Sequence, residues 1–189
     1  MVPPKVFEAR AKSGVSSTSH VSLRPLLPGD LESLWGARMR SDEPWADSSD
    51  AARRKLRDRV ANSGRISHGE LLLGIVSDGR LAGEIQARQP EMGLPPGVFE
   101  IGIEIFDPTA RGGGIGRRAL GLFLAHLFDE EKAHRVQLTT DVDNQAMRRV
   151  AERLGFRLEG TLRGFMPTKD GPRDYVMYGI TREEWEATR

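Results

Sequence analysis

Two spacings of hydrophobic residues divide the chain into predicted strands and helices. Alternating or unbroken apolar residues, the pattern of strands, occur in seven segments: Val21–Arg24, Glu70–Val76, Leu81–Ala87, Val98–Phe106, Arg135–Asp141, Phe156–Met166 and Asp174–Ile180. Apolar residues three and four positions apart, the pattern of amphipathic helices, occur in four segments: Asp30–Met39, Asp50–Val60, Gly112–Glu131 and Asn144–Leu154. Their order along the chain predicts a mixed sheet with helices on its faces.

Residues typical of turns and caps separate these elements. Ser77–Arg80 has the composition of a tight hairpin turn, and Pro167–Gly171 joins the last two predicted strands into a second hairpin. Gly155 stands where a helix C-terminal cap is expected. The basic stretch Arg53–Arg59 in the second predicted helix is interpreted as a solvent-exposed face.

The chain is expected to form one domain. Its 189 residues fit an ordinary single domain, and the sequence contains no internal repeat. Residues 1–20 are rich in Ser, Pro and basic side chains. They are therefore predicted to form a flexible N-terminal tail before a single domain at 21–189.

Composition excludes several classes of protein. Hydrophobic residues make up 38% of the chain, which is enough to build a core. The net charge of +1 does not indicate a nucleic-acid or membrane-surface partner. Because Cys is absent, disulfides, a thiolate nucleophile and a Cys-ligated metal are excluded. The sequence has no apolar run long enough to span a bilayer and no apolar segment typical of a signal peptide, so we expect a cytoplasmic protein.

The most informative segment is a glycine-rich turn at residues 107–116, between a predicted strand and the longest predicted helix. Residues 112–114 are consecutive glycines, so backbone N–H groups can approach a ligand without obstruction from side chains. The N-terminus of the helix adds unpaired N–H donors and the positive end of its dipole. Arg111, Arg117 and Arg118 add positive charge. Together these features predict a binding site for a pyrophosphate.

Counting positions excludes two other phosphate-binding motifs. A Walker loop requires Gly-Lys-Ser/Thr at its end, and no lysine follows these glycines. The dinucleotide fingerprint requires glycines at positions n, n+2 and n+5. Counted from Gly112, the third of these positions is occupied by Arg117. A glycine-rich connection that only turns the chain is the alternative interpretation.

Two segments carry a resemblance to a known family. Arg111-x-x-Gly114-x-Gly116, between a strand and a helix, resembles the acyl-CoA signature of the GNAT N-acetyltransferase superfamily. Asn144–Phe156, in which Asn opens a helix that ends in Gly-Phe, is similar to the family's second conserved segment. Three further segments resemble the branch of ribosomal-protein N-terminal, spermidine and antibiotic acetyltransferases: Arg24-Pro25-Leu26, Glu100–Ile103 and Asp174–Tyr178. The resemblance covers nearly everything from Val21 to Trp185.

The resemblance implies an α/β (α+β) fold with acetyl-CoA as acyl donor and with no metal. The sheet would be mixed, mostly antiparallel and seven-stranded, splayed between its fourth and fifth strands and flanked by about four helices. The pantetheine arm would lie in the splay, and the pyrophosphate would lie on residues 112–116. The cofactor-binding residues implied are Ile105, Phe106, Asp107, Arg111, Gly112, Gly113, Gly114, Ile115, Gly116, Arg117 and Asn144.

Acetyl transfer to an amine requires a base, because an alkyl ammonium with a pKa of about 10 must lose a proton before it attacks. Glu100 and Glu104 are the candidates, since strand periodicity places both on one face of the sheet. Either could instead be an ordinary solvated strand residue or the partner of a basic neighbour. The resemblance also implies that a backbone N–H near Ile105–Asp107 stabilises the oxyanion.

The sequence assigns no general acid to the departing thiol. Many family members carry Tyr seven residues after the conserved Asn, and many of this branch carry Ser three residues after it. This chain has Ala151 and Met147 at those positions. Tyr175 and Tyr178 are the only tyrosines and are predicted to fill a strand face. Asn144 is also a suitable N-cap for the helix that it opens.

The resemblance implies that two segments line the acceptor site: Ser41–Trp45, which joins the first two predicted helices, and Pro167–Asp174 of the final hairpin. Glu43 and Asp174, with Asp42 and Asp170, would attract a cationic amine, and Trp45 would stack on it. The alternative is that these acidic residues only solvate the loops. The acceptor remains open among a protein N-terminus, a polyamine, an amino sugar and a drug amine. It is thus either a small molecule or a peptide.

The leading hypothesis is an N-acetyltransferase that moves an acetyl group from acetyl-CoA to a primary amine by direct attack in a ternary complex. A non-catalytic acyl-CoA-binding regulatory module is the alternative. A protein-interaction domain that uses the basic stretch Arg53–Arg59 ranks third. No nucleic-acid or membrane partner is expected, and exposed strand edges are compatible with a homodimer.

Overall fold

The computed structural model describes residues 7–8, 20–40, 47–89 and 93–189. The chain divides into two compact units. Unit 1 consists of Met1–Ala87 and Ile103–Phe123, and unit 2 consists of Arg88–Gly102 and Leu124–Arg189. The chain passes between the units within strands and one helix, so β4, β5 and α3, defined below, each have residues in both.

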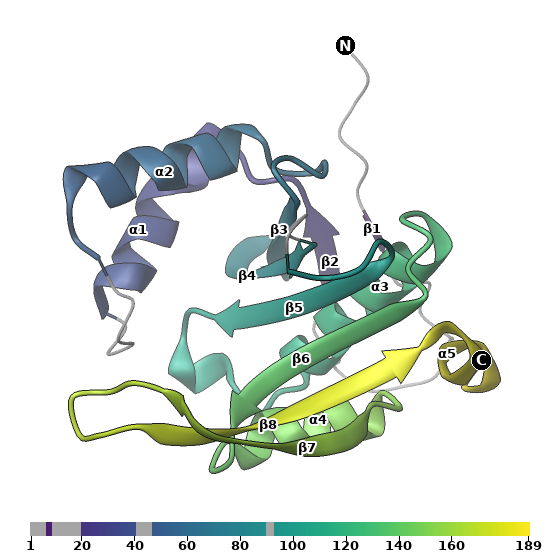
Figure 1. The fold of residues 1–189 in the computed structure, drawn as a ribbon. Helices are drawn as coiled ribbons and strands as arrows, with labels where there is room; N and C mark the ends of the chain where they lie inside the picture. Colours follow the sequence, from purple (N-terminus) through teal and green to yellow (C-terminus); the bar gives the residue numbers. More distant parts are fainter. Residues whose placement is uncertain (1–6, 9–19, 41–46, 90–92) are drawn as a thin grey trace. The chain divides into compact units, whose positions relative to one another are not determined.

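Unit 1 contains the strands that come first in the chain. In the order in which they pair, they are β1 (Phe7–Glu8), β2 (Val21–Arg24), β3 (Glu70–Ser77), β4 (Arg80–Arg88) and the end of β5 (Val98–Ile105) (Figure 1). The pairs β1–β2 and β2–β3 are antiparallel. The short strand β1 was not predicted, since it lies in the segment expected to be a tail.

The predicted hairpin between β3 and β4 is confirmed. Asp78 and Gly79 form its two-residue turn with positive φ angles of 48° and 79°. Such a turn matches the natural twist of paired strands and favours Asp-Gly at these two positions.

The helices α1 (Leu31–Arg40) and α2 (Asp50–Ala61) lie next to each other in unit 1 (Figure 1). They contribute to a hydrophobic cluster of buried side chains: Leu26, Leu34, Leu56, Val60 and Leu72. Ser49 caps α2 by accepting a hydrogen bond from the N–H of Ala52 at 3.1 Å.

The prediction that residues 53–59 form a solvated face is wrong at Arg59. Its side chain is only 16% exposed and forms an ion pair with Glu70, with Nε at 2.8 Å from Oε2. Arg54 and Arg57 are exposed, as expected. Helical spacing places Arg59 nearer the buried side of α2 than these two residues, which is why its charge needs a partner inside the fold.

Replacing Leu56 by alanine is expected to destabilise the protein by about 2–5 kcal/mol, the usual cost of a cavity at a fully buried leucine. Leu56 has no exposed surface in the structure. Urea unfolding followed by circular dichroism measures the loss. A change below about 0.5 kcal/mol, typical of surface substitutions, would contradict the packing described for α2.

Unit 2 contains the start of β5 and the remaining strands, which pair in the order β5, β6 (Arg135–Asp141), β8 (Arg173–Thr181) and β7 (Arg157–Met166). The pair β5–β6 is parallel, with a register from Val98 opposite Arg135 to Glu100 opposite Gln137. The pairs β6–β8 and β7–β8 are antiparallel. All seven predicted strands are present, and the predicted mixed, mostly antiparallel sheet is confirmed.

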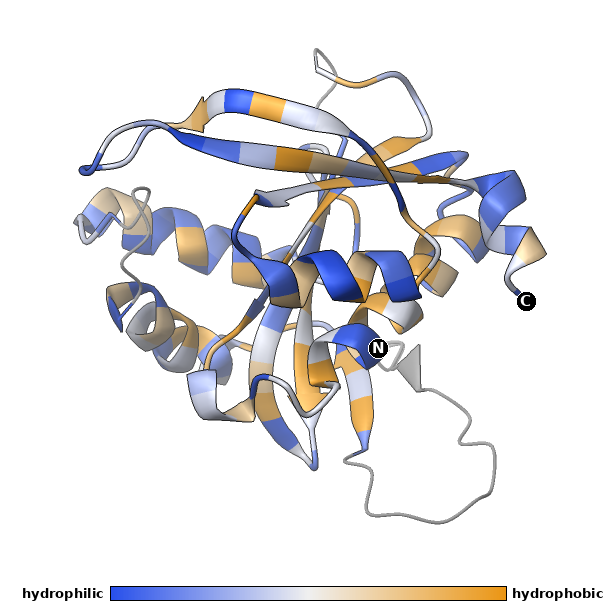
Figure 2. Ribbon diagram, turned by 90° about the horizontal axis from the view of Figure 1, so that it is seen from below, coloured by the Kyte–Doolittle hydropathy of each residue, from blue (hydrophilic) through white to orange (hydrophobic). Residues whose placement is uncertain are grey.

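Three helices complete the described fold: α3 (Ile115–Asp129), α4 (Gln145–Arg153) and α5 (Arg182–Ala187). Helix α4 is largely hydrophilic (Figure 2), and Ala151 is its buried residue. The predicted role of Gly155 at the end of this helix is confirmed, because it follows the C-cap residue Leu154 with a φ of 89°.

Helix α5 was missed by the pattern of apolar residues. It begins at a capping box in which the Thr181 side chain accepts from the N–H of Glu184 and the Glu184 side chain accepts from the N–H of Thr181. The described part of the chain therefore has five α-helices where four were expected. None of the helices in the described ranges is both long and apolar enough to cross a membrane.

Candidate active site

The glycine-rich turn connects the end of β5 to α3 in unit 1. A short 3-10 helix, η2 (Pro108–Ala110), follows β5, and α3 begins at Ile115. The prediction that the helix starts at Gly112 is therefore wrong by three residues, and the glycines lie in the turn before it. Gly112 and Gly114 have φ angles of 84° and 81°, which side-chain-bearing residues rarely adopt.

The turn presents a row of unused backbone donors. Among the described residues, the N–H groups of residues 112–117 have no hydrogen-bond acceptor. The first bond of α3 is donated by the N–H of Arg118 to the carbonyl of Gly114 at 3.1 Å. A β-carbon built on Gly112 would have no heavy atom within 4 Å, so the space beside this residue is open. Unused donors at the N-terminus of a helix favour an anion.

The arginines beside the turn have two different roles. Arg111 donates to the carbonyl of Ile105 at 3.0 Å from Nη2, and Arg118 donates to the carbonyl of Gly113 at 3.2 Å. Arg111 therefore ties the turn to the end of β5, and Arg118 ties α3 to the turn. Arg117 is exposed on the first turn of α3. Its charge is added to that of the unused N–H groups.

Asp107 shapes the entrance to the turn. Its carboxylate accepts hydrogen bonds from the hydroxyl and the N–H of Thr109, at 2.7 and 2.8 Å. These bonds hold the pKa of Asp107 below its ordinary value. The carboxylate is thus engaged within η2, whereas the N–H of Asp107 has no acceptor among the described residues.

Phe106 does not provide the predicted oxyanion donor. Its N–H donates to the carbonyl of Ala82 on β4 at 3.0 Å. Its side chain packs against the hydrophobic cluster of unit 1. Within the predicted range Ile105–Asp107, the unused N–H of Asp107 is therefore the donor that the geometry favours.

The two candidate bases have different surroundings. Glu100 belongs to unit 2 and forms an ion pair with Arg88 at 3.2 Å. This is the alternative of a basic neighbour that the sequence left open. Glu104 belongs to unit 1, in the same strand end as the glycine-rich turn, and is half-buried. The negative charge of Glu104 acts to raise the pKa of Arg38 on α1.

Asn144 is the N-cap of α4, a role that the sequence also indicated. Its side-chain oxygen accepts from the N–H of Met147 at 3.0 Å, so it caps α4 in unit 2. Ala151 is fully buried, and so is Tyr178, whose hydroxyl donates to Glu152 at 2.9 Å. The prediction that Tyr178 fills a strand face is confirmed.

The predicted acceptor residues are only partly described. Asp42, Glu43 and Trp45 lie outside the described residues. Asp174 accepts a hydrogen bond from the N–H of Gly164 at 2.7 Å, and in this way it joins β7 to β8 in unit 2. The exposed Asp170 lies in the turn of this hairpin.

Unit 1 thus brings together Glu104 and the residues of the glycine-rich turn, while Glu100, Asn144 and Asp174 belong to unit 2. Sequence reasoning did not single out the ion pair of Arg38 and Glu84, which also lies in unit 1. Glu84 is 8% exposed although it carries a carboxylate. A charged residue within the strand segment Ala82–Ile85 was the available signal.

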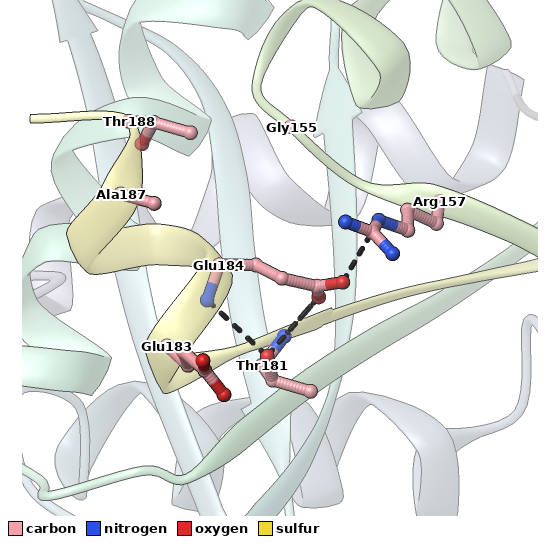
Figure 3. A pocket seen from close by; sticks show the side chains of 7 residues that line it. All are labelled: Gly155, Arg157, Thr181, Glu183, Glu184, Ala187 and Thr188. Atoms are coloured by element: carbon pink, nitrogen blue, oxygen red, sulfur yellow. Dashed lines mark hydrogen bonds and ion pairs between the residues drawn. The ribbon is translucent and has the colours of Figure 1, made fainter.

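A surface hollow lies where α5 begins in unit 2 (Figure 3). Its polar side chains bind one another: Glu184 bonds to Thr181 in the capping box and pairs with Arg157 at 2.8 Å. The hollow contains none of the predicted site residues. We therefore assign these side chains to the capping of α5 and not to the candidate active site.

Comparison with known proteins defines the class. A family model described as an acetyltransferase (GNAT) domain matches residues 20–157. Because the match covers most of the chain, the protein belongs to the GNAT acetyltransferase family, which confirms the resemblance stated from the sequence.

Relatives support this assignment. The chain is 31% identical over 114 residues to the SPbeta prophage-derived uncharacterized N-acetyltransferase YokL of Bacillus subtilis (strain 168), covering 60% of this chain and 63% of YokL. It is 31% identical over 143 residues to the mycothiol acetyltransferase of Salinispora arenicola (strain CNS-205), covering 72% of this chain and 44% of that protein. The chain therefore spans less than two thirds of these relatives.

Solved structures share the fold. Mycobacterium smegmatis RimJ, solved in complex with CoA-disulfide, is 25% identical with a TM-score of 0.70, over 97% of this chain and 87% of RimJ. A chimera of the spermidine N-acetyltransferase SpeG from Vibrio cholerae and hSSAT has a TM-score of 0.74 at 20% identity, over 90% of this chain and 99% of the chimera. At that identity the second likeness concerns the fold alone.

Proposed function

We propose that the protein is an acetyl-CoA-dependent N-acetyltransferase that acetylates a primary amine by direct attack in a ternary complex. The observation that carries this proposal is the row of unused N–H groups at residues 112–117. Converging backbone donors at the start of a helix are suited to a diphosphate. The CoA-disulfide bound to RimJ supports a CoA ligand for this fold.

The residues present fit this ligand. Gly112 and Gly114 allow the backbone of the turn to face a phosphate, and Arg117 adds an exposed positive charge. When bound, acetyl-CoA supplies an activated thioester carbonyl. In this proposal the N–H of Asp107, which has no acceptor among the described residues, donates to the developing oxyanion.

Glu104 accepts the proton of the acceptor amine in this proposal, either directly or through water. It is half-buried in the unit that contains the turn, and Glu100 belongs to the other unit. A general base contributes about 10²–10⁴-fold to a rate. Since the chain has no Cys, a cysteine acyl-enzyme is excluded and direct attack is favoured.

The lack of an acid at two positions motivates the second candidate, a non-catalytic acyl-CoA-binding module. Ala151 is fully buried, and its methyl side chain has no proton to donate to the departing thiolate. The two candidates differ in one respect only, namely whether an amine releases CoA.

A CoA-release assay over a panel of amines tests the proposal. Because the protein has no Cys, a thiol reagent reports only the CoA that is set free. We expect release with at least one of a peptide N-terminus, a polyamine, an amino sugar or a drug amine. Binding of acetyl-CoA without release over the whole panel would instead support the binding module.

We place this reaction in the cytoplasm, with a small molecule or a peptide as acceptor. The absence of a strong net charge supports an acceptor other than nucleic acid.

A further inference from the structure

A cluster of charged side chains links α1 and α2 to the strands of unit 1. Arg59 of α2 donates from Nε and Nη2 to the two carboxylate oxygens of Glu70 on β3, at 2.8 and 3.0 Å. It also donates to Gln86 on β4. Burial acts to lower the pKa of Arg59, but the bonds to Glu70 and the charges of Glu84 and Glu70 outweigh it and raise the pKa. Arg59 and Glu70 therefore satisfy each other.

Glu84 is the carboxylate left over in this cluster. Its Oε1 lies 3.8 Å from Nη2 of Arg38 and 4.0 Å from Nη1 of Arg59, which is too far for hydrogen bonds. Its Oε2 is buried and has no hydrogen-bond partner among the described residues. A buried carboxylate oxygen without a donor is costly, because it gives up its hydrogen bonds to water and gains none in exchange.

Arg38 is the matching cation. Its guanidinium makes the ion pair with Glu84 and shows no hydrogen bond within the described part of the chain. Burial lowers the pKa of Arg38, and the charges of Glu84 and Glu104 offset this only in part. Its side chain is 30% exposed, so this edge of the cluster is open to solvent.

The cluster is adjacent to the candidate base. The negative charges of Glu84 and Glu104 both act to raise the pKa of Arg38. A β-carbon built on Gly83 would meet the carbonyl oxygen of Glu104, and the N–H of Phe106 bonds to the carbonyl of Ala82, so the end of β5 lies directly against β4. A ligand that bound Arg38 and Glu84 would therefore have its amine close to Glu104 and to the strand end that leads into the glycine-rich turn.

We propose that Arg38 and Glu84 form the acceptor subsite and select an amine with a carbonyl or carboxylate oxygen beside it, as in the α-amino group of a peptide or amino acid. This inference rests on the proposed function. An ammonium group can donate to the carboxylate of Glu84, and the neighbouring oxygen can accept from the guanidinium of Arg38, which forms no hydrogen bond among the described residues. A polyamine offers donors only, so it gives the guanidinium no acceptor.

Acceptor kinetics of purified full-length protein test this subsite. Initial rates of CoA release are measured with a short peptide that has a free N-terminus, with a simple alkyl amine and with spermidine. The peptide is expected to be the best of the three by kcat/KM. Higher kcat/KM for spermidine than for the peptide would overturn the proposal.

One variant, Glu84→Gln, and its matched control, Glu70→Gln, separate an effect on peptide binding from an effect on stability. Glu84→Gln is expected to raise the KM for the peptide by about tenfold or more, while the affinity for acetyl-CoA stays as in the wild type. Glu70→Gln, in the same cluster, is expected to lower the melting temperature and to leave that KM within about threefold. Equal rises of KM in both variants would show a structural role only and overturn the proposal.

Arg38→Met keeps the test decisive if Glu84→Gln does not fold. It is expected to raise the KM for the peptide but not for the alkyl amine, because only the peptide uses the guanidinium. A uniform change for both amines would contradict the assigned selectivity.

Calorimetry on CoA-loaded protein distinguishes failure of the subsite from failure of the proposed function. Peptide binding that is lost in Glu84→Gln supports the subsite even if no amine releases CoA. If the wild type binds no peptide under these conditions, the subsite is wrong, whatever the CoA-release assay shows.

Discussion

Replacing Gly114 by alanine is expected to weaken acetyl-CoA binding by about tenfold or more, the loss of one or more charge-assisted hydrogen bonds. Gly114 has a φ of 81°, and a β-carbon there would lie 3.1 Å from Nη1 of Arg118. Both effects push the turn away from the backbone conformation that leaves its N–H groups without an acceptor among the described residues. Isothermal titration of acetyl-CoA into each protein measures the change.

Gly79→Ala is the matched control for backbone strain. Gly79 has nearly the same φ, 79°, in the turn between β3 and β4, and a β-carbon there would meet no heavy atom within 4 Å. Both variants are expected to lose about 1 kcal/mol of folding stability, the cost of the left-handed conformation. Only Gly114→Ala should lose affinity. Equal affinities in the two variants would show that the turn does not hold the cofactor.

Replacing Glu104 by glutamine is expected to lower kcat by about 10²-fold or more, because the amide cannot accept the proton of the amine. The affinity for acetyl-CoA should not change, since Glu104 lies in β5 before the turn. Steady-state rates with a saturating amine, together with a binding titration, separate the two effects.

Glu100→Gln is the control for this prediction. Glu100 lies on the same strand, but its carboxylate is paired with Arg88 at 3.2 Å. Its side chain is 31% exposed, so the pair contributes little stability. We expect kcat within about threefold of the wild type. A larger loss in Glu100→Gln than in Glu104→Gln would reverse the assignment of the base.

Local signals were sufficient for most of the fold. The hairpin between β3 and β4 was predictable because Asp78-Gly79 suits a two-residue turn, and the end of α4 was predictable from Gly155. Helix α5 carries a capping box, but its six residues are too few to show helical periodicity. The strand β1 has two residues and depends on its pairing with β2, so no local pattern marks it.

The candidate site was predictable only where backbone chemistry defines it. Three consecutive glycines before a helix indicate an anion site without knowledge of the rest of the fold. The two glutamates of β5 could not be separated, because strand periodicity places both on one face and Arg88 comes from another strand. The Arg38–Glu84 pair joins a helix to a strand, and such a contact follows from tertiary packing rather than from spacing along the chain.

The claim that the turn at residues 112–117 holds the diphosphate of CoA is tested most directly by a crystal structure of the protein with CoA. The account predicts diphosphate oxygens within about 2.7–3.2 Å of backbone nitrogens in this turn, the range of N–H···O hydrogen bonds. A diphosphate bound at any other part of the molecule, with these N–H groups facing solvent, would contradict it.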